Sequence, residues 1–509
     1  MSAADKESWH HTSPLAAVFY LGKIYQDIAK NAVPSLAPLA VFLGAYEGDL
    51  MSKIIFGVTA FVLVTIIIAF LRYWFFRYRF ADNSVLIREG VFKKTQLDIK
   101  FDRIQAINTQ QNIVFRAIGL VTVKLDTAGS AKQEGYLPAV KTALADALKE
   151  RIRQESPAMS STREATSDTA DEERRGVAAR TLLQLSAGDM VRIGLSSNRA
   201  LIFLVFLGPI IEQFDQKIEK SIDEGTVLTA VEGAQASIAD GIALGLMILF
   251  GFLLFLVVTS IIGAFLRYHR FELVVDNDVL RSTGGLLTRH EHSVNLAKIQ
   301  TVVATQNFML RLFKRFRLQT KQASSGRPGR GKNFVIPLCE PDRLAILSQE
   351  IFGEEFPDVI LEPTAAAFLP IAKQYVRSRF ILTGILPATA FTALMSVPLG
   401  PYALVFLLWI PINAYGVWRM YRRYGVLVTQ DGLALRRGFI GYRVTAFLHR
   451  KVQRISLTQT LQQRRKGLAT LRFYLASGSV KVPYVDFEKA SELRDYVLYR
   501  IESSLMAWH

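Results

Sequence analysis

The amino-acid sequence predicts a membrane protein of mixed α and β structure, built from three similar units. Each unit is an apolar hairpin followed by a small β-rich domain that ends in a helix. Three observations predict this fold class: long apolar blocks without charges, a motif that occurs three times, and strand-like then helix-like spacing of apolar residues after each block. Half of the 509 residues are apolar and 21% are charged, which fits neither an ordinary soluble globule nor a chain buried wholly in lipid.

The apolar blocks are residues 54–71, 241–266 and 380–418, none of which contains Asp, Glu, Lys or Arg. Each is long enough to cross the ~30 Å hydrocarbon core of a bilayer as a helix. The third block has 39 residues. As one helix it would be about twice as long as the membrane is thick. It must therefore turn back, and the segment VPLGP at 397–401 predicts the turn.

Weaker apolar segments lie at residues 32–46 and at about 197–211. They would complete hairpins in the first two units, so the chain is expected to form six transmembrane helices in three hairpins. A re-entrant or interfacial helix is the alternative for each weak segment.

Charged residues orient these hairpins. The predicted loops are residues 47–52, with two acids and no base, residues 212–240, with seven acids and two lysines, and the uncharged turn. Basic residues mark the cytoplasmic ends of spans, and here they gather at the opposite ends of the apolar blocks. They are Arg72, Arg77, Arg79, Arg267, Arg270, Arg419, Arg422 and Arg423. We therefore expect the β-rich domains in the cytoplasm, a reducing compartment that suits a chain with a single cysteine, Cys339.

A fourteen-residue pattern occurs three times, as RIQAINTQQNIVFR at 103–116, KIQTVVATQNFMLR at 298–311 and KVQRISLTQTLQQR at 451–464. In each copy a glutamine follows a basic and a branched residue. A second glutamine comes six positions later, and an arginine five positions after that. A glycine followed by two apolar residues lies upstream at a constant distance. Repetition at fixed spacing predicts three copies of one structural unit. The repeated positions are Gly90, Gly285 and Gly438; Gln105, Gln300 and Gln453; Gln111, Gln306 and Gln459; and Arg116, Arg311 and Arg464.

Apolar spacing around the motif is that of strands and then of a helix. Residues 120–127 and 316–321 alternate as half-buried strands do, and the glycines follow short strand-like runs where a hairpin turn is expected. Each unit then ends in an amphipathic stripe spaced by three or four residues. The stripes are Leu144, Leu148 and Ile152; Leu344, Leu347 and Ile351; and Leu493, Val497 and Ile501.

These residues resemble the bacterial pleckstrin-homology (PH) domain of membrane proteins of the YdbS and YdbT type, formerly catalogued as a domain of unknown function. The resemblance covers about residues 70–152, 265–352 and 419–503. It implies a barrel-like sheet of seven strands capped by a helix, in a bacterial plasma-membrane protein without an assigned reaction. Two turn positions depart from the pattern: Lys314 replaces the glycine found at 119 and 467, and Thr460 replaces the asparagine found at 112 and 307.

The expected organisation alternates membrane segments and PH-like domains. It comprises an N-terminal segment with the first hairpin at 1–76, a domain at 77–152, a polar linker at 153–179, the second hairpin at 180–266, a domain at 267–352, the third hairpin at 353–419 and a domain at 420–505.

Two local patterns suggest ligand sites that the sequence does not support. GRPGRGKN at 326–333 begins like a phosphate-binding loop, but Asn333 stands where that motif needs Ser or Thr, and strands flank it where a helix should follow. A hairpin tip whose bases contact anionic headgroups is the alternative, through Arg327, Arg330 and Lys332. His290 and His292 share a strand face without a companion ligand in the other units, so no metal is expected.

The repeated glutamines and glycines are expected to be structural, because a glutamine can bond turn backbone groups. For Arg116, Arg311 and Arg464 two interpretations stay open: a structural pairing, or recognition of lipid or protein at the surface.

We therefore expect a non-enzymatic membrane scaffold without cofactors, whose three PH-like domains contact anionic membrane lipid and a protein partner, such as another PH-like membrane protein. A transporter or lipid-translocating subunit regulated by these domains is the alternative function. Nucleic acid is not an expected partner, because the basic residues flank membrane segments without interleaved stacking aromatics.

Overall fold

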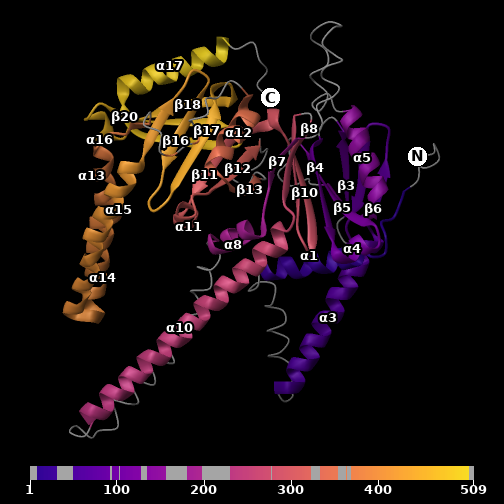
Figure 1. Cartoon of the computed structure of the whole chain (residues 1–509), viewed down its shortest axis with the longest axis horizontal. Helices are drawn as coiled ribbons and strands as arrows, with labels where there is room; N and C mark the ends of the chain where they lie inside the picture. Colours follow the sequence, from indigo (N-terminus) through magenta and orange to yellow (C-terminus); the bar gives the residue numbers. More distant parts are fainter. Residues whose placement is uncertain are drawn as a thin grey trace.

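Three β-rich domains form a row, and the apolar helices leave that row on one side (Figure 1). The computed structural model describes residues 9–30, 50–91, 94–101, 104–127, 135–155, 180–197, 230–276, 278–322, 333–353, 361, 363 and 368–503.

Three helical segments are long and apolar enough to cross a membrane: Ile55–Trp74, Leu249–Tyr268 and Gln374–Arg423. The first lies in α3 (Leu50–Trp74) and the second in α10 (Ala230–Tyr268). Few of their side chains are buried inside the protein. Such apolar, exposed helices are typical of segments that face lipid. The other predicted spans, at 32–46 and 197–211, lie outside the described residues except for Ser197.

The third apolar segment folds back on itself near Gly400, which has a φ of +53°. Phe391 and Phe406 stack edge to face across the two arms, with ring centroids 4.8 Å apart. The indole of Trp409 donates to the carbonyl oxygen of Thr383 at 2.9 Å. The segment consists of α13 (Gln374–Phe380), a π-helical turn (Ile381–Ile385), α14 (Leu386–Leu399), a 3₁₀ stretch (Gly400–Leu408) and α15 (Trp409–Arg423).

Each domain has three strands before the repeated motif, three strands from the motif onward, and a closing helix. The first domain contains β1 (Arg77–Phe80), β2 (Ser84–Glu89), β3 (Thr95–Lys100), β4 (Ile104–Asn112), α4 (Ile113–Ala117), β5 (Leu120–Thr127), β6 (Gly135–Lys141) and α5 (Thr142–Glu155).

The second and third domains repeat this order. The second contains β8 (Glu272–Asp276), β9 (Val279–Gly284), β10 (Thr288–Asn295), β11 (Ile299–Gln306), α11 (Phe308–Leu312), β12 (Phe316–Gln322), β13 (Asn333–Cys339) and α12 (Pro341–Phe352). The third contains β15 (Gly425–Val428), β16 (Gly432–Arg437), β17 (Tyr442–Leu448), β18 (Val452–Thr458), α16 (Leu461–Arg464), β19 (Leu468–Leu475), β20 (Gly478–Asp486) and α17 (Phe487–Ser503).

The closing helices cover the sheets, as their spacing predicts. In α12 the stripe of Leu344, Leu347 and Ile351 is buried against the sheets of its domain. Leu148 and Ile152 of α5, and Val497 and Ile501 of α17, are buried in the same way.

A short strand also precedes each membrane segment. β7 (Arg180–Gln184) pairs with β8, and β14 (Leu369–Pro370) pairs with β15. In the first domain an isolated bridge between His10 and Tyr78 has the same place, before α1 (Ala16–Lys30). Residues 180–184, which are expected from the sequence to belong to the second membrane hairpin, instead form a strand that extends a sheet. Behind β7, α8 (Ala187–Leu195) packs tightly on α10, where Ser260 donates to the carbonyl oxygen of Gly194 at 2.8 Å.

The sheets do not stop at the domain boundaries. The second half of the first domain and the first half of the second form one antiparallel sheet of seven strands, in the order β6-β5-β4-β10-β9-β8-β7. The second and third domains share another, in the order β13-β12-β11-β17-β16-β15-β14. Sheets of three strands remain at the two ends of the row, β1-β2-β3 and β18-β19-β20. The three domains are therefore joined by backbone hydrogen bonds between strands, which the repeated motif does not predict.

The two junctions use the same register. Gln111 of β4 lies opposite Arg289 of β10, four residues after Gly285. Gln306 of β11 lies opposite Tyr442 of β17, four residues after Gly438. At both boundaries, therefore, the second repeated glutamine of one domain lies opposite the residue four positions after the repeated glycine of the next domain.

The turn after the motif is also the same in all three domains. The side chains of Asn112, Asn307 and Thr460 each cap a short helix by accepting from the backbone three residues on. Thr460 therefore replaces asparagine without loss of the cap. Lys314 adopts a φ of +52°, close to the +68° of Gly119 and the +62° of Gly467, so the departure from glycine does not change the turn.

Candidate functional site at the domain junctions

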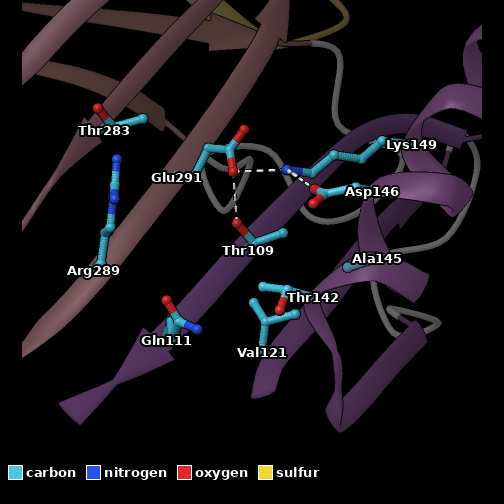
Figure 2. Close-up of a pocket in the computed structure, with 10 residues that line it drawn as sticks. All are labelled: Thr109, Gln111, Val121, Thr142, Ala145, Asp146, Lys149, Thr283, Arg289 and Glu291. Atoms are coloured by element: carbon cyan, nitrogen blue, oxygen red, sulfur yellow. Dashed lines mark hydrogen bonds and ion pairs between the residues drawn. The ribbon is translucent and has the colours of Figure 1, made fainter. Parts of the chain in front are cut away.

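A cavity of about 160 Å³ opens at the first junction, between β4 and α5 of the first domain and β9 and β10 of the second (Figure 2). Its main polar group is Glu291 of β10. The Glu291 carboxylate accepts from Lys149 of α5 at 2.7 Å and from the hydroxyl of Thr109 at 2.8 Å. Arg281 lies 3.5 Å from the other carboxylate oxygen. One carboxylate of the second domain therefore binds two side chains of the first.

The protonation of Glu291 follows from these partners. Burial raises its pKa, but the bonds from Lys149 and Thr109 lower it by more, so the pKa of this carboxyl lies below its ordinary value. The group is charged and fully engaged at neutral pH. Glu291 therefore holds the two domains together. It is not suited to act as a general base, because a general base needs a lone pair that is free to take a proton.

Further polar contacts extend the first junction along the strand pair. Ser293 donates its backbone N–H to the amide oxygen of Asn108 at 3.2 Å and its hydroxyl to the carbonyl oxygen of Ile107 at 3.0 Å. This junction is therefore mainly polar.

The second junction is mainly apolar. Val444, Ala446 and Leu448 of β17 are buried in the core of the second domain, together with Val302 and Ala304 of β11. A fully buried lysine adds a polar contact, because the ammonium of Lys451 donates to the carbonyl oxygen of Ala297 at 2.7 Å. The backbones are so close that a Cβ on Gly441 would lie 1.9 Å from the carbonyl oxygen of Gln306.

Exposed apolar side chains gather where each junction meets the end of an apolar helix. At the first junction α4 and the β9–β10 turn present Ile113, Val114, Ile118, Leu286 and Leu287. At the second, α11 and the β16–β17 turn present Phe308, Met309, Leu312, Phe439 and Ile440. We call these two groups the junction tips.

Hydrogen bonds from a backbone N–H and from an arginine side chain fix the junction tips beside the apolar helices. The backbone N–H of Leu286 donates to the carbonyl oxygen of Leu266, near the end of α10, at 2.9 Å. Arg423, the last residue of α15, donates to the carbonyl oxygens of Phe439 at 2.7 Å and Gly441 at 3.0 Å. The apolar tips therefore lie at the depth where these helices would emerge from a membrane.

A family model described as the bacterial PH domain matches residues 34–156, 226–351 and 379–501, which is most of the chain. The chain belongs to the bacterial PH domain family. Its three PH domains are the three repeats described above.

Two curated proteins of Bacillus subtilis (strain 168) are similar to this chain. The UPF0699 transmembrane protein YdbT is 23% identical over 420 residues, which cover 79% of this chain and 80% of YdbT. The UPF0699 transmembrane protein YdbS is 28% identical over 137 residues, which cover 25% of this chain and 81% of YdbS. No solved structure matches the chain.

Within the PH domains the second repeated glutamine makes the same bond each time. Its side-chain amide donates to the backbone carbonyl nine residues on, from Gln111 to Leu120 at 2.7 Å and from Gln459 to Leu468 at 2.9 Å. The bond from Gln306 to Arg315 is 3.3 Å long. These glutamines bridge the turn between two strands of one sheet.

The first repeated glutamine has no such common role. Gln300 is buried in the second PH domain, where the next domain covers its strand, whereas Gln453 is exposed in the third. The side chain of Gln105 lies outside the described residues.

The repeated glycines occupy the turn between the second and third strands of each domain, and the turns at Gly285 and Gly438 belong to the junction tips. Gly90 and Gly285 have φ values of +113° and +117°. A Cβ on Gly285 or Gly438 would lie 2.0 Å from a backbone oxygen across the turn, so a side chain does not fit there.

Two of the three repeated arginines reach the next PH domain. The guanidinium of Arg116 donates to the carbonyl oxygen of Leu286 at 3.0 Å, and that of Arg311 lies over the ring of Tyr442, 5.7 Å from its centroid. Arg464 belongs to the third PH domain. Arg327, Arg330 and Lys332 lie outside the described residues.

The paired histidines lie on the first-junction strand β10. The rings of His290 and His292 stack with centroids 6.0 Å apart. In the described part of the chain, no group of three or more His, Cys, Asp or Glu side chains is placed to hold a metal ion.

The apolar tips were missed as functional residues, although their signal is visible in the sequence. Two apolar residues follow each repeated glycine, and a turn between polar strands has no structural need for them.

We predict that Glu291→Gln weakens the first junction. Loss of the charge removes the attraction of Lys149, which should lower the free energy of unfolding by about 1–2 kcal/mol at pH 7. Because the pKa of Glu291 is depressed on folding, its contribution is present above its ordinary value of 4.5 and is lost as the pH falls below it. Thermal unfolding in detergent at pH 7 and pH 4 measures both effects.

Asp146→Asn is the matched control. This carboxylate is 70% exposed and 3.7 Å from the same lysine, so its loss should change stability by less than about 0.5 kcal/mol. Equal effects of the two variants would show that Glu291 does not hold the junction.

Proposed function

We propose that this protein is a non-enzymatic scaffold of the bacterial plasma membrane. Its three PH domains form one continuous platform on the cytoplasmic face, anchored by six transmembrane helices in three hairpins. The observation that carries the proposal is the joining of the domains by shared sheets, because it fixes all three PH domains in one row.

The arrangement of the helices supports this orientation. α3, α10 and the α13–α15 segment leave the row of PH domains on one side (Figure 1). Arg72, Arg267 and Arg422 lie in the last turns of α3, α10 and α15, next to the domains. Basic residues at helix ends favour the cytoplasmic side.

The junction tips support contact with lipid. Leu287 and Ile440 are 45% and 49% exposed although they lie beside helices that face lipid. Burial of such a side chain in the interface is worth about 1.5–3 kcal/mol, and each nearby arginine gains about 1 kcal/mol from anionic headgroups. The platform would thus lie flat on the membrane instead of hanging from three flexible anchors.

A protein partner of a scaffold needs a surface that these domains can recognise. We propose another membrane protein with a PH-like domain, since the junctions show that such domains bind one another edge to edge.

A transporter, the alternative function, would need polar groups that line a path between spans. A polar contact inside the third apolar segment instead joins its two arms: the hydroxyl of Thr383 lies 3.2 Å from the amide oxygen of Asn413. We therefore prefer the scaffold.

We predict opposite accessibility for two engineered cysteines in intact cells. Val397→Cys lies at the hairpin turn, where Val397 is 91% exposed, and should react with a membrane-impermeant maleimide from outside. Glu488→Cys, at an exposed position of α17 in a PH domain, should react only after the cells are opened. Natural Cys339 is buried, and burial raises its pKa to about 12, so it should stay unlabelled. Labelling of Glu488→Cys in intact cells would refute the cytoplasmic placement.

We also predict that the second junction tip enters the lipid interface. An environment-sensitive fluorophore on Ile440→Cys should shift its emission to the blue when the protein moves from detergent into vesicles, more so with anionic lipid. The control is Glu488→Cys on α17, which is exposed and lies on the side of the row away from α14 (Figure 1). Identical spectra for the two probes in vesicles would exclude lipid contact at the tip.

A further inference from the structure

Each junction joins two kinds of strand, and at each end of the row one strand of these kinds has no junction partner within the described chain. β4 and β11 each pair with the third strand of the next PH domain, and their counterpart in the last domain is β18. β10 and β17 are the third strands that receive them, and their counterpart in the first domain is β3. Both β3 and β18 are outer strands of three-stranded sheets.

We propose that β18 of one chain pairs with β3 of a second copy, so that chains join head to tail through the contact that already joins their domains. The inference names the partner of the scaffold proposed above, and its biological meaning rests on that function. The strand pairing itself does not depend on which membrane face carries the domains.

The repeated register defines the proposed pair. Gln110 lies opposite His290 and Thr305 lies opposite Arg443, each five residues after the repeated glycine of the receiving domain. The same rule places Thr458 of one chain opposite Thr95 of the next. Leu457 then lies opposite Gln96, and Ile455 opposite Asp98.

Burial shows what the missing partner would cover. In β11, which is paired on both sides, Gln300 and Thr301 are 5% and 2% exposed. The residues at the same repeat positions of β18, Gln453 and Arg454, are exposed. The outer edge of β18 thus leaves exposed two repeat positions that are buried in β11.

Arg464 points to the same partner. Arg116 bonds the carbonyl oxygen one residue after the glycine of the next domain, and Arg311 lies over the ring of Tyr442. The side chain of Arg464 forms no hydrogen bond or ion pair with the residues that the structure describes. In the proposed pair its guanidinium meets the carbonyl oxygen of Val91 in the second chain, as Arg116 meets that of Leu286.

The polarity of the edges favours this partner over unspecific strand pairing. The outward residues Gln96, Asp98 and Lys100 of β3 are exposed and polar. Glu291 and Ser293 hold the corresponding places on β10, where they form the polar first junction. Charged residues on an edge strand suppress pairing with unrelated edges, while a complementary neighbour can still satisfy them.

Head-to-tail pairing joins two different surfaces of the protein, so it produces rings or open chains instead of symmetric dimers. Within one chain, each junction leaves the apolar helices on the same side of the row (Figure 1). Repetition of the same contact between chains would therefore keep every copy in one membrane.

Disulfide cross-linking of the purified full-length protein tests the proposal. Two differently tagged variants, Thr95→Cys and Thr458→Cys, are mixed in detergent and oxidised. We expect a disulfide-linked dimer that carries both tags and is lacking when either variant is oxidised alone. Within one chain, Gln110→Cys with His290→Cys is the matched positive control, because these residues are opposed in the first junction. Buried Cys339 should not interfere.

Each alternative has its own result. A Thr458→Cys dimer formed without the other variant would mean a symmetric β18–β18 contact and would overturn head-to-tail pairing. No mixed dimer, with the internal control oxidised, would show that these edges do not pair. Capture of a different PH-like protein at Thr458→Cys in membranes, without self-capture, would replace the second copy as the partner. The maleimide experiment tests the orientation of the PH domains in the membrane. Its failure would contradict the cytoplasmic placement without contradicting the pairing of β18 with β3.

Charge variants of the same two exposed residues provide a test without cysteine. Thr95→Lys with Thr458→Lys should shift the protein to the monomer in light scattering, since the two lysines would face each other across the pair. Thr95→Glu with Thr458→Lys should restore association. Loss of association in both double variants would contradict the proposed register.

Discussion

Backbone hydrogen bonds across the domain boundaries determine the architecture of this protein. β4 with β10, and β11 with β17, turn three PH domains into a row with two shared sheets. A side-chain interface between separate domains can slide or rotate, whereas a strand pair fixes spacing and direction together. The placement of the junction tips, the apolar helices and the free end strands all follows from this pairing.

The two junctions use the same backbone geometry with different side chains. The first is held by the charged bonds of Glu291, and the second by the burial of Val444, Ala446 and Leu448 in the neighbouring core. Apolar burial gives the second junction more affinity, while the polar first junction gains selectivity because an unmatched buried carboxylate is costly. A third junction between chains, with Asp98 and Gln96 at its centre, would be of the polar kind and suited to reversible assembly.

Much of each PH domain could be predicted from the sequence, because its determinants are local. Glycine spacing marks the turns, the capping residue at 112, 307 or 460 marks the short helix, and apolar stripes mark the closing helices. The short strand β7 could not be predicted, since five residues before a membrane segment carry no periodicity of their own. The bonds from Arg116 and Arg311 depend on a neighbouring domain, which no spacing within one repeat reveals.

The shared sheets left one signal in the sequence. β17, YRVTAFL, ends in five consecutive uncharged residues that are all buried, as expected of a strand covered on both sides, whereas β3, TQLDIK, alternates as a half-exposed strand does. Hydrogen–deuterium exchange compares these equivalent strands directly in the monomeric Thr95→Lys, Thr458→Lys variant. If strand pairing joins the domains, the amides of β17 exchange many times more slowly than those of β3. Equally fast exchange in the two strands would show that the PH domains are separate and that the shared sheets do not form.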